Sequence, residues 1–279
     1  MIQIIKTYDE CRDFVSDFQS DPNLSDPMLC DKEQVQCNLI KSIEKPDSHC
    51  VLGIYRGEQM MGLFAFLVLR EERYIEMLVG LSRETEAHQE VFQYLEQWYP
   101  GYNADFVFNP GNYMLKDLLA QRGAEFEPEQ QKMVLGKPVP GLDTTGVELL
   151  SGKYAQQYCD LHNKDMYWTG EKVAEAQDRF RTFLAIHHGK VVGYLDVTHT
   201  FQENEIYDLF VWKAYRRMGY GRKLLAKALE MNQPKGMMLL VDADNDPAIR
   251  LYASMGFEKV QNQNNLTARW TIPGQKAVV

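Results

Sequence analysis

The stretch RRMGYGRKLL at positions 216–225 places two glycines among four basic side chains, at what reads as the start of a helix. Glycine is a poor helix former, so its presence indicates a backbone that must approach another group closely. A helix N-terminus leaves its first N–H groups unpaired and carries a partial positive charge, which suits a pyrophosphate. The stretch therefore predicts an anion-binding turn around Gly219 and Gly221. A solvated basic surface turn is the alternative.

Two carboxylates just before this turn could act as a base. Asp208 lies inside the apolar strand IYDLFV, where an unpaired carboxylate is costly, so it needs a partner or a chemical role. Glu205 lies three residues earlier and is the other candidate, acting through a water molecule. A carboxylate near a strand end is more often a solvated edge residue, and that alternative stays open for both.

The elements that must position these residues occur twice in the chain. At an offset of 132 to 133 residues, CVLGIYRGEQMMGLFAFLV (50–68) aligns with TFLAIHHGKVVGYLDVTHT (182–200), and NYMLKDLLAQRGAEF (112–126) aligns with NDPAIRLYASMGFEK (245–259). Each half reads as a strand, two helices, a hairpin, a long strand, a helix, a strand, a helix and two final strands. This order predicts an α/β (α+β) fold of two tandem domains, each a mixed, mostly antiparallel sheet flanked by helices. The loop-like segment from Leu135 separates them, so we expect domains at 1–138 and 146–279.

The composition excludes several classes of protein. The chain has 279 residues and a net charge of -9, with 13 basic against 23 acidic residues in 1–139 and 17 against 16 in 140–279. An acidic chain is a poor nucleic-acid binder. No apolar run of membrane-spanning length and no signal peptide are apparent, which predicts a cytoplasmic protein that does not bind membranes. The five cysteines are scattered without a CxxC pair, so neither a disulfide framework nor a metal site is expected.

The second half resembles the GNAT superfamily of N-acyltransferases. VWKAYRRMGYGRKLL matches the acyl-CoA signature of that family, with Arg216, Gly219 and Gly221 in order between a strand and a helix, and NDPAIRLYASMGF (245–257) matches its second segment. The resemblance covers residues 146–271 and extends in a fainter form to the first half. A dinucleotide-binding fingerprint fits less well, because no third glycine follows at position 224.

The resemblance implies a set of site residues. Pantetheine would lie along the exposed edge of strand 206–211, and an amide near Val211 would polarise the acyl carbonyl. Tyr252 would donate a proton to the departing thiolate, although a helical tyrosine is more often a core residue. Asn245 could both cap its helix and touch the cofactor. The implied acyl-CoA-binding residues are Leu209, Phe210, Val211, Arg216, Arg217, Met218, Gly219, Tyr220, Gly221, Arg222, Asn245 and Tyr252.

Some positions depart from the family pattern or line the expected acceptor side. Lys213 stands where proline is common and Arg217 where glycine is common. The loop after His162 lines the acceptor pocket in this family, so Tyr167 and Trp168 could form an aromatic wall there, with buried packing as the alternative. The histidine pair at 187 and 188 falls in a hairpin turn and reads as surface.

The first half has lost the signature. By the same offset Arg216, Gly219 and Gly221 fall on Glu84, Ala87 and Gln89, and Tyr252 falls on Leu119. This pattern predicts a degenerate GNAT-like domain that supports the catalytic one, with either an acidic wall for the acceptor or simple solubility as its contribution. Tandem proteins of this plan exist within the family.

The sequence thus predicts an acetyl-CoA-dependent N-acetyltransferase. A primary amine of a small molecule or peptide would attack directly in a ternary complex, in a monomer with an internal pseudo-dimer or in a homodimer. The alternative is a non-catalytic acyl-CoA-binding regulatory module.

Overall fold

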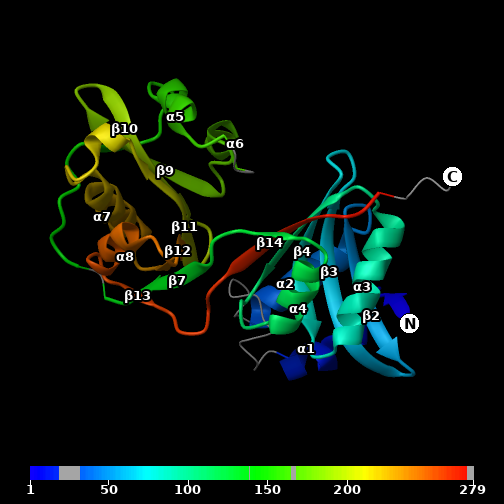
Figure 1. The fold of residues 1–279 in the computed structure, drawn as a ribbon. Helices are drawn as coiled ribbons and strands as arrows, with labels where there is room; N and C mark the ends of the chain where they lie inside the picture. Colours follow the sequence, from blue (N-terminus) through cyan, green and yellow to red (C-terminus); the bar gives the residue numbers. More distant parts are fainter. Residues whose placement is uncertain (19–31, 138, 165–167, 275–279) are drawn as a thin grey trace. The chain divides into compact units, whose positions relative to one another are not determined.

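The computed structural model describes residues 1–18, 32–137, 139–164 and 168–274 (Figure 1). It divides the chain into two compact units, Met1–Gln130 with Gln261–Val279, and Gln131–Val260. Each unit is built on a seven-stranded sheet. The predicted fold class is confirmed, because both sheets are mostly antiparallel and carry helices on both faces.

The sheet of the first unit has the strand order β1-β2-β3-β4-β5-β14-β6. Its strands are β1 (Ile2–Ile4), β2 (His49–Arg56), β3 (Gln59–Leu69), β4 (Tyr74–Ser82), β5 (Asn103–Phe108), β14 (Leu266–Thr271) and β6 (Glu125–Phe126). Its helices are η1 (Tyr8–Glu10), α1 (Arg12–Phe18), α2 (Lys32–Glu44), α3 (Thr85–Trp98) and α4 (Tyr113–Gln121). Alternate strand residues bury on opposite faces, so Leu52 packs with α3 and α4 while Val51 packs with α1 and α2.

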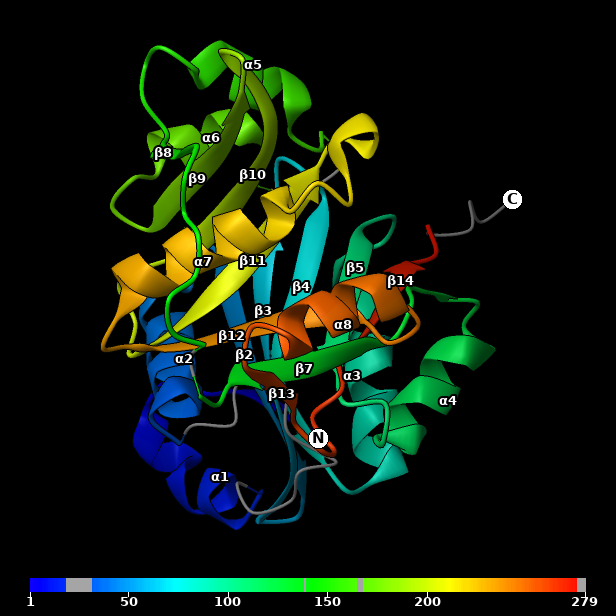
Figure 2. The ribbon, with the colours of Figure 1, turned by 90° about the vertical axis from the view of Figure 1, so that its left-hand side faces the viewer.

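The sheet of the second unit has the strand order β13-β7-β12-β11-β10-β9-β8. Its strands are β13 (Phe257–Lys259), β7 (Gln130–Leu135), β12 (Gly236–Asp242), β11 (Glu203–Val211), β10 (Lys190–Thr198), β9 (Phe180–His187) and β8 (Val147–Leu149). Its helices are α5 (Ala155–Leu161), α6 (Gly170–Glu175), η3 (Lys213–Tyr215), α7 (Tyr220–Asn232) and α8 (Asp246–Ala253). The helices α7 and α8 cover one face of this sheet (Figure 2), and α5 and α6 cover the other.

The two sheets exchange one strand. The last strand, β14, pairs with β5 and β6 in the first sheet, whereas β7 pairs with β13 and lies beside β12 in the second. The two strands therefore occupy equivalent places in their sheets. The expected boundaries at 1–138 and 146–279 need correction, because the chain passes between units at residues 130 and 260.

Candidate active site

The central strand of the second unit opens on one side. Strand β11 pairs in parallel with β12 only from Glu203 to Ile206, but it stays paired with β10 as far as Val211. The β12-facing edge of β11 is therefore free of strand pairing beyond Ile206. Leu209, Phe210 and Val211, which were predicted to line such an edge, lie on this part of the strand and are half-buried.

A bulge in β11 coincides with this opening. Asp196 of β10 faces Asp208, and the next residue, Val197, faces Ile206, so Tyr207 is an extra residue in β11. A bulge bends a strand and redirects its side chains. Beyond it, Phe210 stacks on Tyr194 with ring centroids 5.7 Å apart.

The glycine turn lies between the end of β11 and the start of α7. Gly219 is the N-cap of α7 with a φ of 87°, a left-handed conformation that glycine adopts without strain. The first helical bond runs from the Lys223 N–H to the Gly219 carbonyl at 3.0 Å. The N–H groups of residues 220–222 consequently lack intrahelical acceptors, which is the condition for binding an anion. At Gly221 a Cβ atom would lie 3.2 Å from the Leu251 side chain, so this glycine also lets α7 and α8 pack closely.

The basic side chains around the turn have different roles. Nε of Arg216 donates to the carbonyl of Val211 at 2.9 Å and so fastens the turn to the strand end. Arg222 donates to Ser254 Oγ at 2.7 Å. Lys223 forms an ion pair with Asp143 at 2.8 Å, and its hydrogen bond holds the pKa of that carboxyl below its usual value. Lys223 is therefore paired with Asp143 at the start of α7. Arg217 and Met218 are exposed.

The departure at Arg217 has a structural consequence. Its φ is 64°, in the left-handed region that costs an L-residue roughly 1–2 kcal/mol. Replacing Arg217 with Gly should remove this strain at a smaller entropic cost, so we expect the second unit to be about 0.5–1 kcal/mol more stable in the absence of ligand. Thermal unfolding checks this, with Arg222→Gly in the first turn of α7 as the matched control that should be destabilised by about 1 kcal/mol. A lower melting temperature for Arg217→Gly would contradict the expectation.

The predicted acid, Tyr252, interacts electrostatically with one predicted base, Asp208. Tyr252 is 7% exposed and packs edge-on against Phe257. Burial and the charge of Asp208 raise the pKa of Tyr252, so its hydroxyl stays protonated at neutral pH. Burial also raises the pKa of Asp208, while a 2.6 Å hydrogen bond from the Tyr194 hydroxyl opposes that rise.

The other predicted base lies deeper in the strand. Burial raises the pKa of Glu205 to about 7, against the opposing charges of Arg179 and Lys132. The same strand position in the first unit holds Glu76, because Met77 and Ile206 both precede the bulge. A carboxylate at this position therefore occurs in both units.

The other predicted positions have different outcomes. Asn245 caps α8 by accepting the Ala248 N–H at 3.2 Å; its contact with a cofactor stays a prediction. Tyr167 lies outside the described residues. Trp168 packs edge-on against Phe180 at 5.0 Å, as the packing alternative expected. The His187 ring accepts or donates a 2.6 Å hydrogen bond with the Tyr220 hydroxyl, so the hairpin histidine is attached to the start of α7 instead of being only surface.

Sequence reasoning missed the residues beside Asp208. The buried Asp196 accepts hydrogen bonds from Tyr158, Thr182 and His162. A signal was present, because Asp196 interrupts the apolar run VVGYLDV just as Asp208 interrupts IYDLFV.

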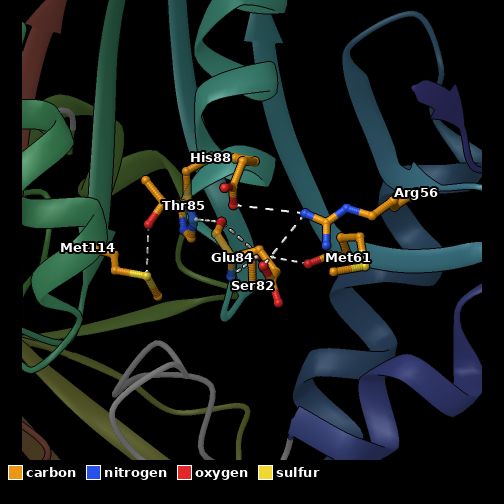
Figure 3. A network of polar contacts seen from close by, with 8 residues as sticks. Arg56, Met61, Ser82, Glu84, Thr85, His88 and Met114 are labelled. Atoms are coloured by element: carbon orange, nitrogen blue, oxygen red, sulfur yellow. Dashed lines mark hydrogen bonds and ion pairs between the residues drawn. The ribbon is translucent and has the colours of Figure 1, made fainter.

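The first unit lacks the glycine turn altogether. Strand β4 ends at Ser82 and α3 begins at Thr85, whereas residues 212–219 separate β11 from α7. The short connection is closed by Ser82, whose Oγ accepts the Glu84 N–H at 3.0 Å and donates to the Met61 carbonyl at 2.7 Å (Figure 3). The fixed-offset alignment of Arg216 with Glu84 is therefore inexact, because most of residues 212–219 have no counterpart.

Charge also disfavours a phosphate at this place in the first unit. The carboxylates of Glu84 and Glu86 lie at the start of α3, 3.9 and 4.0 Å from the guanidinium of Arg56. Figure 3 shows Arg56 reaching toward Glu84 from the neighbouring hairpin. Carboxylates already occupy the position where a helix N-terminus would attract an anion.

Two global features bear on the class of protein. Within the described ranges no helix combines the length and the apolar character needed to cross a membrane. In the same residues no group of three or more His, Cys, Asp and Glu side chains is arranged to hold a metal ion.

The second unit is similar in sequence to known acetyltransferases. Residues 147–257 match the model of the acetyltransferase (GNAT) family. The chain is 36% identical over 76 residues to the N-alpha-acetyltransferase RimI of Mycobacterium tuberculosis, covering 26% of this chain and 48% of that protein. It is 31% identical over 129 residues to the mycothiol acetyltransferase of Thermomonospora curvata, covering 43% and 42%. The matches thus span less than half of either relative.

A solved structure resembles the whole chain. The tandem GNAT protein from the clavulanic acid biosynthesis pathway superimposes with a TM-score of 0.61 over 99% of this chain and 100% of that one, at 13% identity. At this identity the likeness shows the fold alone.

Proposed function

We propose that the second unit transfers an acetyl group from acetyl-CoA to a primary amine, because residues 147–257 match the model of the acetyltransferase (GNAT) family. The observation that carries this proposal is that the glycine turn at α7 follows a strand, β11, whose β12-facing edge is unpaired beyond Ile206. The names of the two relatives, an N-alpha-acetyltransferase and a mycothiol acetyltransferase, suggest different acceptors. The proposal therefore includes amines of both small molecules and peptides.

The residues present fit the cofactor. Gly219 has no heavy atom within 4 Å of the place of a Cβ, so the outside of the turn is open to a pyrophosphate. The unpaired N–H groups of residues 220–222 and the exposed Arg217 would bind its oxygens. Leu209 and Val211 would pair with pantetheine through the free edge of β11.

The chemistry is a direct substitution in a ternary complex. Acetyl-CoA supplies the acetyl group as a thioester, whose C–S bond breaks as the C–N bond to the amine forms. Asp208 would take the proton that the attacking amine loses. The Tyr252 hydroxyl would donate to the departing sulfur, and the N–H near Val211 would stabilise the charge on the carbonyl oxygen. The first unit, which lacks the turn, would have a supporting role.

Binding is tested by thermal unfolding with acetyl-CoA. At about 100 times its dissociation constant, a ligand that binds only the folded state adds roughly 2.7 kcal/mol. We expect the wild type to be stabilised and Gly219→Glu not to be, because the new side chain brings a carboxylate and strain to the turn. Gly123→Glu is the matched control, since Gly123 also has a positive φ of 74° with open space around it, but lies in the first unit. Equal stabilisation of all three proteins would overturn the assigned binding site.

Replacing Tyr252 with Phe tests transfer apart from binding. The ring and its packing on Phe257 are kept, so acetyl-CoA should stabilise the variant as it does the wild type. Loss of the donated proton should lower kcat about 100-fold. Release of free CoA thiol in the presence of a panel of amines measures this. Stabilisation by acetyl-CoA without thiol release by the wild type would favour the non-catalytic binding module.

The oligomeric state is also a proposal. Two similar units within one chain fit action as a monomer, with a homodimer as the alternative. Light scattering coupled to gel filtration distinguishes the two.

A further inference from the structure

A buried polar network lies behind Asp208 in the second unit. Asp196 of β10 has no exposed surface. Its carboxylate accepts the Tyr158 hydroxyl at 2.9 and 3.0 Å, the Thr182 hydroxyl at 2.6 Å and His162 Nε2 at 3.1 Å. Burying a carboxylate is costly unless it is paired and hydrogen-bonded, and here it is both.

Both ring nitrogens of His162 face hydrogen-bond acceptors, which favours a proton on each. Nδ1 lies 2.9 Å from the carbonyl oxygen of Asn163, which can only accept, and Nε2 faces the Asp196 carboxylate. Burial lowers the pKa of His162, but the hydrogen bonds to Asp196 and Asn163 outweigh it, so the net pKa is raised. The other ionisable groups near the His162 ring are Asp208 of β11, Glu171 of α6, Tyr158 of α5 and Tyr194 of β10.

The network reaches Asp208 through Tyr194. The His162 ring stacks on the Tyr194 ring with centroids 4.8 Å apart and an interplanar angle of 15°. The Tyr194 hydroxyl then donates to Asp208 at 2.6 Å. Tyr194 therefore contacts both His162 and Asp208.

The first unit provides an internal control for this network. Thr182, Asp196 and Asp208 form one row across β9, β10 and β11, directly beside the bulge. The corresponding row across β2, β3 and β4 is Val51, Ala65 and Val79, all buried and apolar, and it too lies directly beside a bulge. The fold therefore does not need polar residues in this row. The polar row occurs in the unit that has the glycine turn.

We propose that His162 and Asp196 are positioning residues that fix the Tyr194 ring, so that its hydroxyl holds the Asp208 carboxylate in place for the attacking amine. This proposal rests on the proposed acetyltransferase function. The pair need not touch either substrate, because its effect passes through Tyr194.

A double-mutant cycle tests the coupling. We expect His162→Gln and Tyr194→Phe each to lower kcat about tenfold with little change in acetyl-CoA binding, and the double variant to be no slower than Tyr194→Phe alone. Both changes remove an influence that lowers the pKa of Asp208, so the acid limb of the rate profile should move to higher pH. Val173→Ala, an apolar deletion in the same core, should leave kcat and the limb unchanged.

Independent, multiplicative losses of kcat, or a loss in Val173→Ala equal to that in His162→Gln, would overturn the proposal. NMR titration of the Asp208 carboxyl tests the network without turnover, so its outcome stands even if no amine is acetylated. An upward shift of that pKa in His162→Gln that is smaller when Tyr194→Phe is already present supports the coupling through Tyr194. An unchanged pKa in both variants would refute it, whereas a shifted pKa in a protein without turnover would leave the network intact and remove the acetyltransferase proposal.

Discussion

Ending the chain at Val260 is expected to unfold the first unit and to leave the second folded. The deletion removes β14, which lies between β5 and β6 and carries the buried residues Leu266, Ala268 and Trp270 into the first core. Trp270 alone packs against Phe92 at 5.4 Å, and losing one such buried aromatic costs about 3–5 kcal/mol. Because a domain has only about 5–15 kcal/mol of net stability, the loss of a whole inner strand should exceed it.

The second unit contains no residue beyond Val260, so its sheet stays complete. Hydrogen exchange measures both halves of this expectation: the amides of β5 should lose protection, and those of β12 should keep it. Arg269→Ala is the control on the same strand, since this side chain is 61% exposed and its ion pairs with Asp105 and Glu127 contribute at most about 1 kcal/mol. Retained protection in β5 after truncation would contradict the strand exchange.

The exchange could not be predicted from the repeat. Both β7 and β14 follow the closing helix of their halves, and each occupies the same place in a sheet of the same design. Each sheet has an equivalent position for such a strand, so a local sequence pattern cannot predict which of the two strands occupies it. The consequence is practical, because a fragment cut at 146–279 would lack β7 and carry β14 without its sheet. The fragment 131–260 is the one that holds a complete second sheet.

The glycine turn and the strand before it were predictable because they depend on local geometry. A left-handed φ at Gly219 and a helix start at Tyr220 follow from the residue types around them. The absence of the turn from the first unit was harder to predict. An alignment at a single offset cannot show that most of the residues between β11 and α7 have no counterpart there. The contact of Asp196 with His162 could not be predicted from the sequence, because His162 is 34 positions away and the two side chains meet only in the folded domain.

Replacing Asp208 with Asn is expected to lower kcat about 100-fold or more, while Glu205→Gln should have a much smaller effect. The internal comparison separates the two carboxylates. Glu76 occupies the Glu205 position in the unit without a glycine turn, whereas the Asp208 position there holds Val79. A carboxylate present in both units is a feature of the shared fold. One present only in the unit with the glycine turn is the better candidate for a role in the proposed site.

The pH dependence distinguishes the same two candidates. A base must be ionised to accept the proton of the amine, so activity should fall as the pH drops through its raised pKa. If Glu205 were the base, the acid limb would lie near its pKa of about 7 and Glu205→Gln would abolish it. We expect instead that Glu205→Gln keeps the limb and that Asp208→Asn removes both the limb and the rate. Stabilisation by acetyl-CoA should persist in both variants, because neither side chain lies in the glycine turn, and a larger loss of kcat in Glu205→Gln would assign the proton transfer to Glu205.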